Sequence, residues 1–213
     1  MNQNLTELVF ILDRSGSMAG MELDTIGGFN AMIEKQKQEQ GAAFVSTILF
    51  SNESTVLHDR VPVKKVAPLS RRDFQVGGCT ALIDAIGGAI HHIGNIHKYA
   101  RPEDVPAHTM FVITTDGMEN ASHRYTSDEV KRMIEKEQKK YGWEFIFLGA
   151  NIDAVSTAAN FGIARDHAAN YHNDPMGAAV NFDALGEAIS QVRTGGKMKK
   201  SWREKIDHDF MSR

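Results

Sequence analysis

The chain is organised around an apolar segment near its start that runs into a turn rich in oxygen-bearing side chains. Residues Leu8 to Leu12 are all apolar, the run stops at Asp13, and apolar residues return at helical spacing only after Ser17. An apolar run of this length between turn residues predicts a buried strand. Asp13, Ser15 and Ser17 are therefore expected just beyond the carboxyl end of that strand, in the crevice where open α/β sheets bind ligands.

These three side chains offer one carboxylate and two hydroxyl groups at alternate positions. Hard oxygen ligands of this kind suit Mg²⁺ or Mn²⁺ better than zinc or copper. The same residue types also occur in an ordinary strand-to-helix turn that carries a helix cap. The turn by itself leaves both interpretations open, and the remainder of the chain has to separate them.

That remainder alternates between strand and helix patterns. Apolar residues at spacings of three and four predict helices over residues 21–40, 81–97, 126–141, 153–161 and 175–192. Short apolar or alternating runs predict strands over 42–50, 54–60, 108–115, 143–149 and 166–171, the last with a composition poor for a strand. This alternation predicts an α/β fold: a doubly wound, mainly parallel twisted sheet with helices on both faces and 54–60 as one antiparallel edge strand.

No repeat or low-complexity linker breaks the chain, so we expect one domain over residues 1–196. Its last helix should begin after Asp174 and end before Gly195 and Gly196. Residues 197–213 hold six Lys or Arg and three Asp or Glu, a local net charge of +3 (6 − 3). This basic tail is interpreted as a solvated helix or a frayed end, with a docking element as the alternative.

Composition excludes several classes of protein. Hydrophobic residues make up 42% of the chain, enough for a core without disulfides. The net charge of −3 argues against a protein that coats nucleic acid. Cys79 is the single cysteine, which fits a reducing compartment, and neither a secretory signal nor a membrane span is visible in the sequence. We therefore expect a soluble, cytoplasmic protein; the sequence leaves its oligomeric state open.

Two later positions are expected at the same edge of the sheet. Thr80 opens the helix predicted from residue 81, and Asp116 follows the strand predicted to end at Thr115. If the strands ending at Asp13 and Thr115 are neighbours across the switch point of the sheet, their loops face each other. Thr80 alone is equally typical of a helix cap, and Asp116-Gly117 alone of a plain turn. Their coincidence at one edge favours a cation site.

The residues of these three loops resemble a known motif. Asp13-Arg14-Ser15-Gly16-Ser17, Gly77-Gly78-Cys79-Thr80 and Thr115-Asp116-Gly117 are similar to the metal-ion-dependent adhesion site of the von Willebrand factor A domain family. That site pairs an Asp-x-Ser-x-Ser loop with a later Thr and a later Asp. The resemblance covers about Leu5 to Val192 and suggests a stand-alone domain of the bacterial or phage type.

The resemblance implies both a ligand set and a partner. Hydroxyls of Ser15, Ser17 and Thr80 would lie near a divalent cation, and Asp13 and Asp116 would contact it directly or through water. The expected ion is Mg²⁺, with Mn²⁺ or Ca²⁺ as alternatives. If the carboxylates contact the ion only through water, the neutral hydroxyls leave its charge poorly cancelled, so an acidic side chain of another protein would complete the shell.

One position departs from the family pattern. Small residues usually precede the motif threonine, whereas this chain has Cys79. A thiol near the site could admit a softer ion such as zinc. Since cysteine is commonly buried, a small buried side chain is the favoured interpretation.

Other polar residues near these loops have simpler explanations. Asp84 either orients the site or caps and packs the helix, and Glu119 and Asn120 either line the rim or shape their loop. Asp153 is expected to cap the next helix.

The histidines lack the helical pair spacing of a zinc site. His91, His92 and His97 are therefore expected on a solvated helix face.

Three functions compete at this point. The first is a non-catalytic, metal-dependent adaptor for another protein. The second is a Mg²⁺-dependent phosphohydrolase that uses Asp13 as its nucleophile, although Ser15 stands where such enzymes place a second Asp. The third is a structural subunit with a vestigial metal site.

Overall fold

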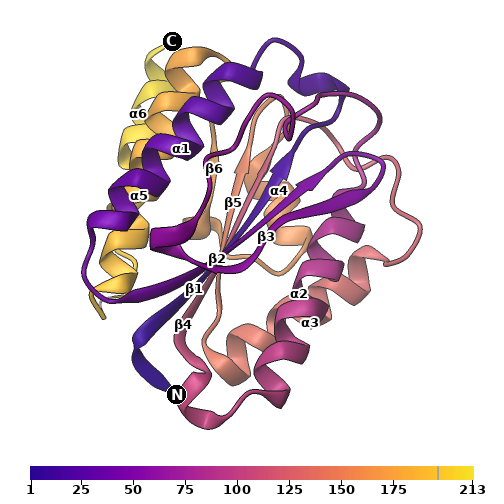
Figure 1. Cartoon of the computed structure of the whole chain (residues 1–213). Coiled ribbons are helices and arrows are strands. Elements are labelled where there is room, and N and C mark those ends of the chain that lie inside the picture. The colour runs from indigo at the N-terminus through magenta and orange to yellow at the C-terminus, as the bar shows by residue number, and fades with distance from the viewer. Residues whose placement is uncertain (196) are drawn as a thin grey trace.

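A single six-stranded sheet forms the centre of the computed structural model, which describes residues 1–195 and 197–213. The strand order is β3-β2-β1-β4-β5-β6 (Figure 1). The strands are β1 (Asn2–Asp13), β2 (Ala42–Phe50), β3 (Ser54–Pro62), β4 (Pro106–Thr115), β5 (Glu144–Gly149) and β6 (Ala168–Asn170). Every neighbouring pair is parallel except β2 with β3, which confirms the predicted fold class. The predicted boundary at Gly196 lies outside the described residues.

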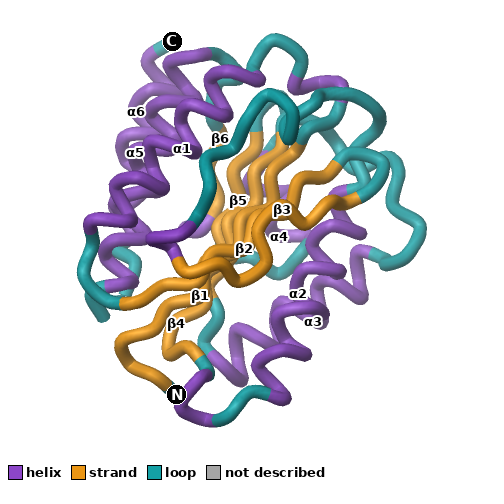
Figure 2. The backbone as a smooth tube through the Cα atoms, in the orientation of Figure 1, coloured by secondary structure: helices purple, strands orange, loops and turns teal. Residues whose placement is uncertain are grey.

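Helices cover both faces of the sheet, as predicted. The helices of the described residues are α1 (Glu22–Gln38), α2 (Leu82–Tyr99), α3 (Ser127–Tyr141), α4 (Ala154–Asn160), α5 (Pro175–Arg193) and α6 (Glu204–Ser212). Figure 1 shows α1, α5 and α6 together on one side, and α2 and α3 together on the other. Figure 2 shows the strands running between these two layers and the loops that leave their ends.

The central strand β1 is buried on both faces because its side chains alternate between two cores. Leu8, Phe10 and Leu12 pack into the core under α1 and α5. Val9 and Ile11 pack into the core under α2 and α3. Burial on both faces explains why the sequence of this strand is a continuous apolar run rather than an alternating one.

The tail forms a short helix and most of its residues are exposed, but one side of it packs against the domain. Trp202 and Ile206 are buried and join the core beneath α5, and Trp202 Nε1 donates to Asp166 O at 2.8 Å. Lys205 pairs with Asp183 at 2.9 Å, so one of the basic residues meets an acid on α5. The sequence interpretation rested on the net charge of the tail and gave no weight to Trp202 and Ile206. These two apolar side chains are four residues apart and lie on one face of the helix, which can therefore be buried. The tail is therefore a helix with one solvated face, which Trp202 and Ile206 attach to the domain.

No helix within residues 1–195 and 197–213 is both long enough and apolar enough to cross a membrane.

Adjacent glycines in α1 provide a matched test of the packing between α1 and α5. A Cβ on Gly28 would lie 2.2 Å from Phe182 Cδ2, whereas a Cβ on Gly27 would have no atom within 4 Å. We expect Gly28→Ala to destabilise the protein by roughly 1–3 kcal/mol, because the Phe182 ring must move in a filled core. Gly27→Ala should instead stabilise the helix by up to about 1 kcal/mol.

Urea unfolding of both variants measures the difference. Equal free energies of unfolding for the two variants would contradict the packing of Phe182 against Gly28.

Candidate metal centre

The loops that carry the predicted site residues leave the same edge of the sheet. β1 and β4 are parallel neighbours, with Leu12 paired to Thr114. Asp13 ends β1 and Asp116 directly follows β4, so both acids lie at the carboxyl edge of adjacent strands. The neighbouring placement of these strands, predicted from the sequence, is confirmed. The chain adds β2 and β3 on one side of β1 and then β4, β5 and β6 on the other, so the switch point of the sheet lies between β1 and β4. Ligands of open α/β sheets usually bind at this point.

A chain of hydrogen bonds joins the first loop to Asp116. Ser15 N donates to Asp13 Oδ1 at 2.7 Å, and the hydroxyls of Ser15 and Ser17 lie 3.0 Å apart. Ser17 Oγ donates to Asp116 Oδ1 at 2.5 Å. Four of the five predicted side chains thus form one connected group. Asp13, Ser15 and Asp116 are each at most 2% exposed, whereas Ser17 is exposed, so the group is shielded except on the side of Ser17.

Thr80 reaches the same group from the second loop. A Cβ on Gly117 would lie 3.1 Å from Ser17 Oγ and 3.2 Å from Thr80 Oγ1, so both hydroxyls face the same backbone position. The alternative role of Thr80 as a helix cap does not apply, since the cap of α2 is Ala81 and no side chain bonds there. Gly117 leaves space at this point that any larger residue would fill.

Backbone hydrogen bonds hold the first and second loops together. Gly16 N donates to Gly78 O at 3.0 Å, and Gly77 N donates to Arg14 O at 2.9 Å. Gly78 has a φ of +81°, and a Cβ there would lie 2.0 Å from Asn52 Oδ1. Only glycine fits this position, which explains why a glycine pair precedes the cysteine and threonine.

Burial raises the pKa of both carboxyl groups. The pKa of Asp13 is raised by burial and lowered in part by hydrogen bonds from Thr115 and Ser15. The pKa of Asp116 is raised by burial and by the negative charge of Asp13, against hydrogen bonds from Ser17 and Asn173. The buried carboxylates of Asp13 and Asp116 repel each other, and the hydroxyls of Ser15 and Ser17 lie between them. A divalent cation would stabilise this arrangement. The residues present therefore fit such an ion.

The donor set determines which ions fit. Within the described parts of the chain, no three His, Cys, Asp or Glu residues come close enough to hold a metal together. The candidate centre has two acids, and its other oxygens are hydroxyls. Such an all-oxygen set belongs to Mg²⁺, Mn²⁺ or Ca²⁺ chemistry rather than to a site of histidines and thiolates.

Three residues of the centre were missed by the sequence reasoning. Thr115 Oγ1 donates to Asp13 Oδ2 at 2.6 Å, and Asn173 Nδ2 donates to Asp116 Oδ2 at 2.9 Å. Tyr171 is buried, and its pKa is raised by burial and by the negative charges of Asp116 and Asp13, so its phenol stays neutral. Thr115 directly precedes Asp116, so its place in the candidate metal centre could have been predicted from the sequence. Nothing in the sequence placed the loop after β6 beside these acids.

Residues near the rim shape their loop. Asp84 is buried in α2, in agreement with its packing alternative, and it accepts hydrogen bonds from the backbone N–H groups of His123, Arg124 and Tyr125. Glu119 accepts from Ile83 N at 2.8 Å, at the start of α2.

The loop also fixes Thr80. Asn120 Oδ1 accepts from Thr80 N at 2.9 Å, and Asn120 N donates to Thr80 O at 3.1 Å. Asp153 caps α4 as predicted, with Oδ1 accepting from Ser156 N.

Two other predictions need correction. Cys79 is exposed rather than buried, because its backbone N–H is held by Asn52 Oδ1 at 2.9 Å in a loop that lies on the surface. His97 does not lie on a solvated face: its side chain is 10% exposed and its Nε2 lies 3.3 Å from the buried Glu7 Oε2. His91 and His92 are exposed, as expected.

Comparisons with solved structures agree with this topology. The von Willebrand factor domain of the type V pili tip protein Mfa5 from Porphyromonas gingivalis matches with a TM-score of 0.63 at 12% identity, over 91% of this chain and 98% of that one. The ArnB paralog VWA2 from Sulfolobus acidocaldarius matches with a TM-score of 0.52 at 19% identity, over 89% and 45%. The chain has the von Willebrand factor A fold.

A third structure with this fold contains a metal. Proximal thread matrix protein 1 (PTMP1) from the mussel byssus, solved with a zinc-occupied MIDAS motif, matches with a TM-score of 0.59 at 12% identity, over 89% of this chain and 47% of that one. The chain thus spans about half the length of PTMP1 and of VWA2. No protein-family profile matches the sequence, and no curated protein matches it.

Proposed function

We propose that this chain is a metal-dependent protein-binding module. Asp13, Ser15, Ser17, Thr80 and Asp116 would hold a divalent cation at the carboxyl edge of the sheet. The observation that carries the proposal is the hydrogen-bonded group of Asp13, Ser15, Ser17 and Asp116, which Thr80 approaches within contact of the same glycine. The zinc-occupied motif of PTMP1, which has the same fold, supports a divalent ion.

Each residue of the candidate metal centre has a distinct role in this proposed function. Asp13 is held on both oxygens, by Ser15 N and Thr115 Oγ1, so it is oriented to supply charge from a fixed position. If Asp13 and Asp116 contact a bound ion through water, the neutral hydroxyls of Ser15, Ser17 and Thr80 leave its charge incompletely cancelled. When bound, a divalent ion supplies a Lewis-acidic position that a carboxylate of a partner protein can ligate.

The burial of Asp13 favours binding over catalysis. Its side chain is 1% exposed and both oxygens already accept hydrogen bonds, whereas a nucleophilic carboxylate must reach an incoming phosphorus atom. We therefore rank the phosphohydrolase below the binding module. The cytoplasmic location and the acidic partner residue are parts of the same proposal.

A pull-down from native lysate with and without EDTA tests this function. We expect a defined set of proteins to be captured by the Mg²⁺-loaded chain and lost both with EDTA and in Ser17→Ala, which removes one hydroxyl of the hydrogen-bonded group. The matched control is Asp153→Ala, which removes an acid that caps α4 and does not take part in the hydrogen-bonded group. Capture that is unchanged by EDTA and by Ser17→Ala would contradict the proposal and favour a structural subunit.

A further inference from the structure

A cavity of about 590 Å³ lies at the other end of the molecule. It opens between the last turns of α2 and α3 and is bordered by Val105 and Pro106, where β4 begins. Asp116 follows the far end of that ten-residue strand, which at about 3.3 Å per residue separates the two places by roughly 30 Å. The cavity is thus separate from the candidate metal centre, and its volume is typical of small-molecule sites.

Aromatic rings form a rigid wall of this cavity. Trp143 is stacked on Phe111 with ring centroids 5.2 Å apart, and His97 meets Trp143 edge-on at 5.4 Å. His97 is in turn held by the buried Glu7. Because these rings are fixed by their neighbours, a ligand would meet a wall that needs little reordering.

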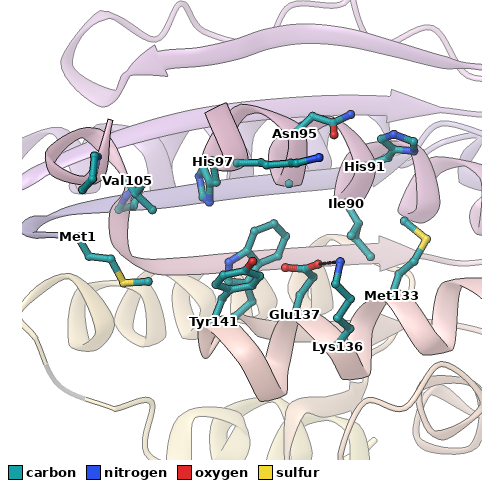
Figure 3. Close-up of a pocket in the computed structure, with 15 residues that line it drawn as sticks. Met1, Ile90, His91, Asn95, His97, Val105, Met133, Lys136, Glu137 and Tyr141 are labelled. Carbon is teal, nitrogen blue, oxygen red and sulfur yellow. Dashed lines mark ion pairs between the residues drawn. The ribbon is translucent and has the colours of Figure 1, made fainter. Parts of the chain in front are cut away.

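The buried charge in the cavity is the carboxylate of Glu137. Its side chain is 7% exposed, and Oε1 lies 3.1 Å from Lys136 Nζ. Figure 3 shows Glu137 and Tyr141 from α3 on one side of the cavity, facing His97 and Asn95 from α2 on the other.

The lysine side chains of the lining lie on its rim. The Lys136 side chain is 65% exposed. Lys98 is exposed, and its Nζ lies 5.0 Å from the Tyr99 ring centroid. Exposed charges are screened by water and salt, whereas a shielded carboxylate acts at low local dielectric.

Backbone dipoles add to the negative potential of the interior. The cavity is bordered by the carboxyl-terminal turns of α2 and α3, and such helix ends carry partial negative charge. The faces of aromatic rings also attract cations. Carboxylate, helix ends and rings therefore all favour a positively charged ligand over a negative one.

We propose that this cavity binds a small aromatic amine in its ammonium form. The ammonium group lies at Glu137 and the aromatic body packs against Trp143 and Tyr141. The ion pair with Lys136 shows that an ammonium group can reach the carboxylate of Glu137. Since Lys136 is exposed, its side chain can give way to a ligand.

Phenethylamine is the probe that tests the proposal. We expect saturable binding by titration calorimetry and by the fluorescence of Trp143 in a Trp202→Phe background, where Trp143 is the remaining tryptophan. Glu137→Gln should weaken binding at least about tenfold, because it removes the charged acceptor. Lys136→Met should tighten binding about threefold, because it removes a competing ammonium.

Substitutions at two glycines of α2 test whether the ligand binds in this cavity. Gly94 lines the cavity, and a Cβ there would lie 3.9 Å from Trp143 Cη2, whereas a Cβ on Gly88 would have no atom within 4 Å. Gly94→Leu should fill the cavity and abolish binding. Gly88→Leu makes the same change of helix propensity on the same helix and should bind like the wild type.

Several results would overturn the proposal. These are tighter binding of 3-phenylpropionate than of phenethylamine, weaker binding by Lys136→Met, and wild-type affinity in folded Glu137→Gln or Gly94→Leu. Absence of any response in the wild type would do the same. The titrations are run in EDTA and repeated in Mg²⁺; equal affinities are expected, so failure here is distinguishable from failure of the metal-dependent function.

Discussion

Asp116→Asn is expected to remove the stabilisation of this protein by Mg²⁺. At an ion concentration a hundred times the dissociation constant, the wild type should gain about 2.7 kcal/mol, which for a domain of this size raises the melting temperature by roughly 5–11 °C. The amide keeps the size of the carboxylate; its oxygen can still accept from Asn173 Nδ2, and its NH2 group can donate to Ser17 Oγ. The variant should therefore fold, and its melting temperature should be the same with Mg²⁺ and with EDTA.

The pH dependence of the metal-free protein provides a second readout of the same residue. Burial raises the folded-state pKa of Asp116 above its ordinary value of 3.8. The stability that this group contributes is thus fully present at pH values below its pKa in the unfolded state. It is lost as the pH rises through its pKa in the folded state. In EDTA at pH 7, Asp116→Asn should be more stable than the wild type, and the difference should shrink as pH falls.

The control for this variant is Asp153→Asn, which changes an acid that caps α4 and should leave the response to Mg²⁺ intact. Thermal unfolding followed by circular dichroism measures all three proteins. A wild type that gains no stability from Mg²⁺, or an Asp116→Asn protein that gains as much as the wild type, would contradict the assignment of Asp116.

Gly177→Ala is expected to have the largest effect on stability of any glycine substitution considered. A Cβ at this position would lie 2.1 Å from the backbone oxygen of His172, and backbone atoms cannot move aside as a side chain can. The overlap lies where the loop after β6 turns into α5. Gly177 is four residues beyond Asn173, whose side chain donates to Asp116. We expect a loss of about 3 kcal/mol or more, together with weakened Mg²⁺ binding.

Gly186→Ala is the matched control in the same helix. A Cβ there would meet Met32 Cγ at 3.6 Å, which is ordinary contact, so this variant should be neutral or slightly more stable. Urea unfolding and Mg²⁺ titration separate the two variants. Similar unfolding midpoints for both would contradict the tight approach of the backbone at Gly177.

The fold was predictable because its central strands have strong, uninterrupted patterns. β2 was predicted at its observed bounds, and the hairpin to β3 was recognised from the short turn between them. The predicted pairing of the first and fourth strands followed from the topology of doubly wound sheets, and it brought Asp13 and Asp116 to one edge. Residues next to strong strands could therefore be placed without coordinates.

The remaining features depend on contacts between segments far apart in the sequence. Asn173 and Tyr171 follow β6, a three-residue strand with a composition poor for one, so nothing local marked them as neighbours of Asp116. The exposure of Cys79 reflects its place in a surface loop tied to Asn52, whereas its residue type suggested burial. Tertiary contacts decided these positions, and local propensity could not.

The most direct test of the candidate metal centre is an anomalous difference map from a crystal of this protein grown with Mn²⁺. We predict one strong peak beside the hydroxyl oxygens of Ser15 and Ser17, at about 2.0–2.3 Å from its ligands, with Asp13 and Asp116 bound directly or through water. A peak elsewhere on the molecule, or a fully occupied Mn²⁺ site that lacks these side chains, would contradict it.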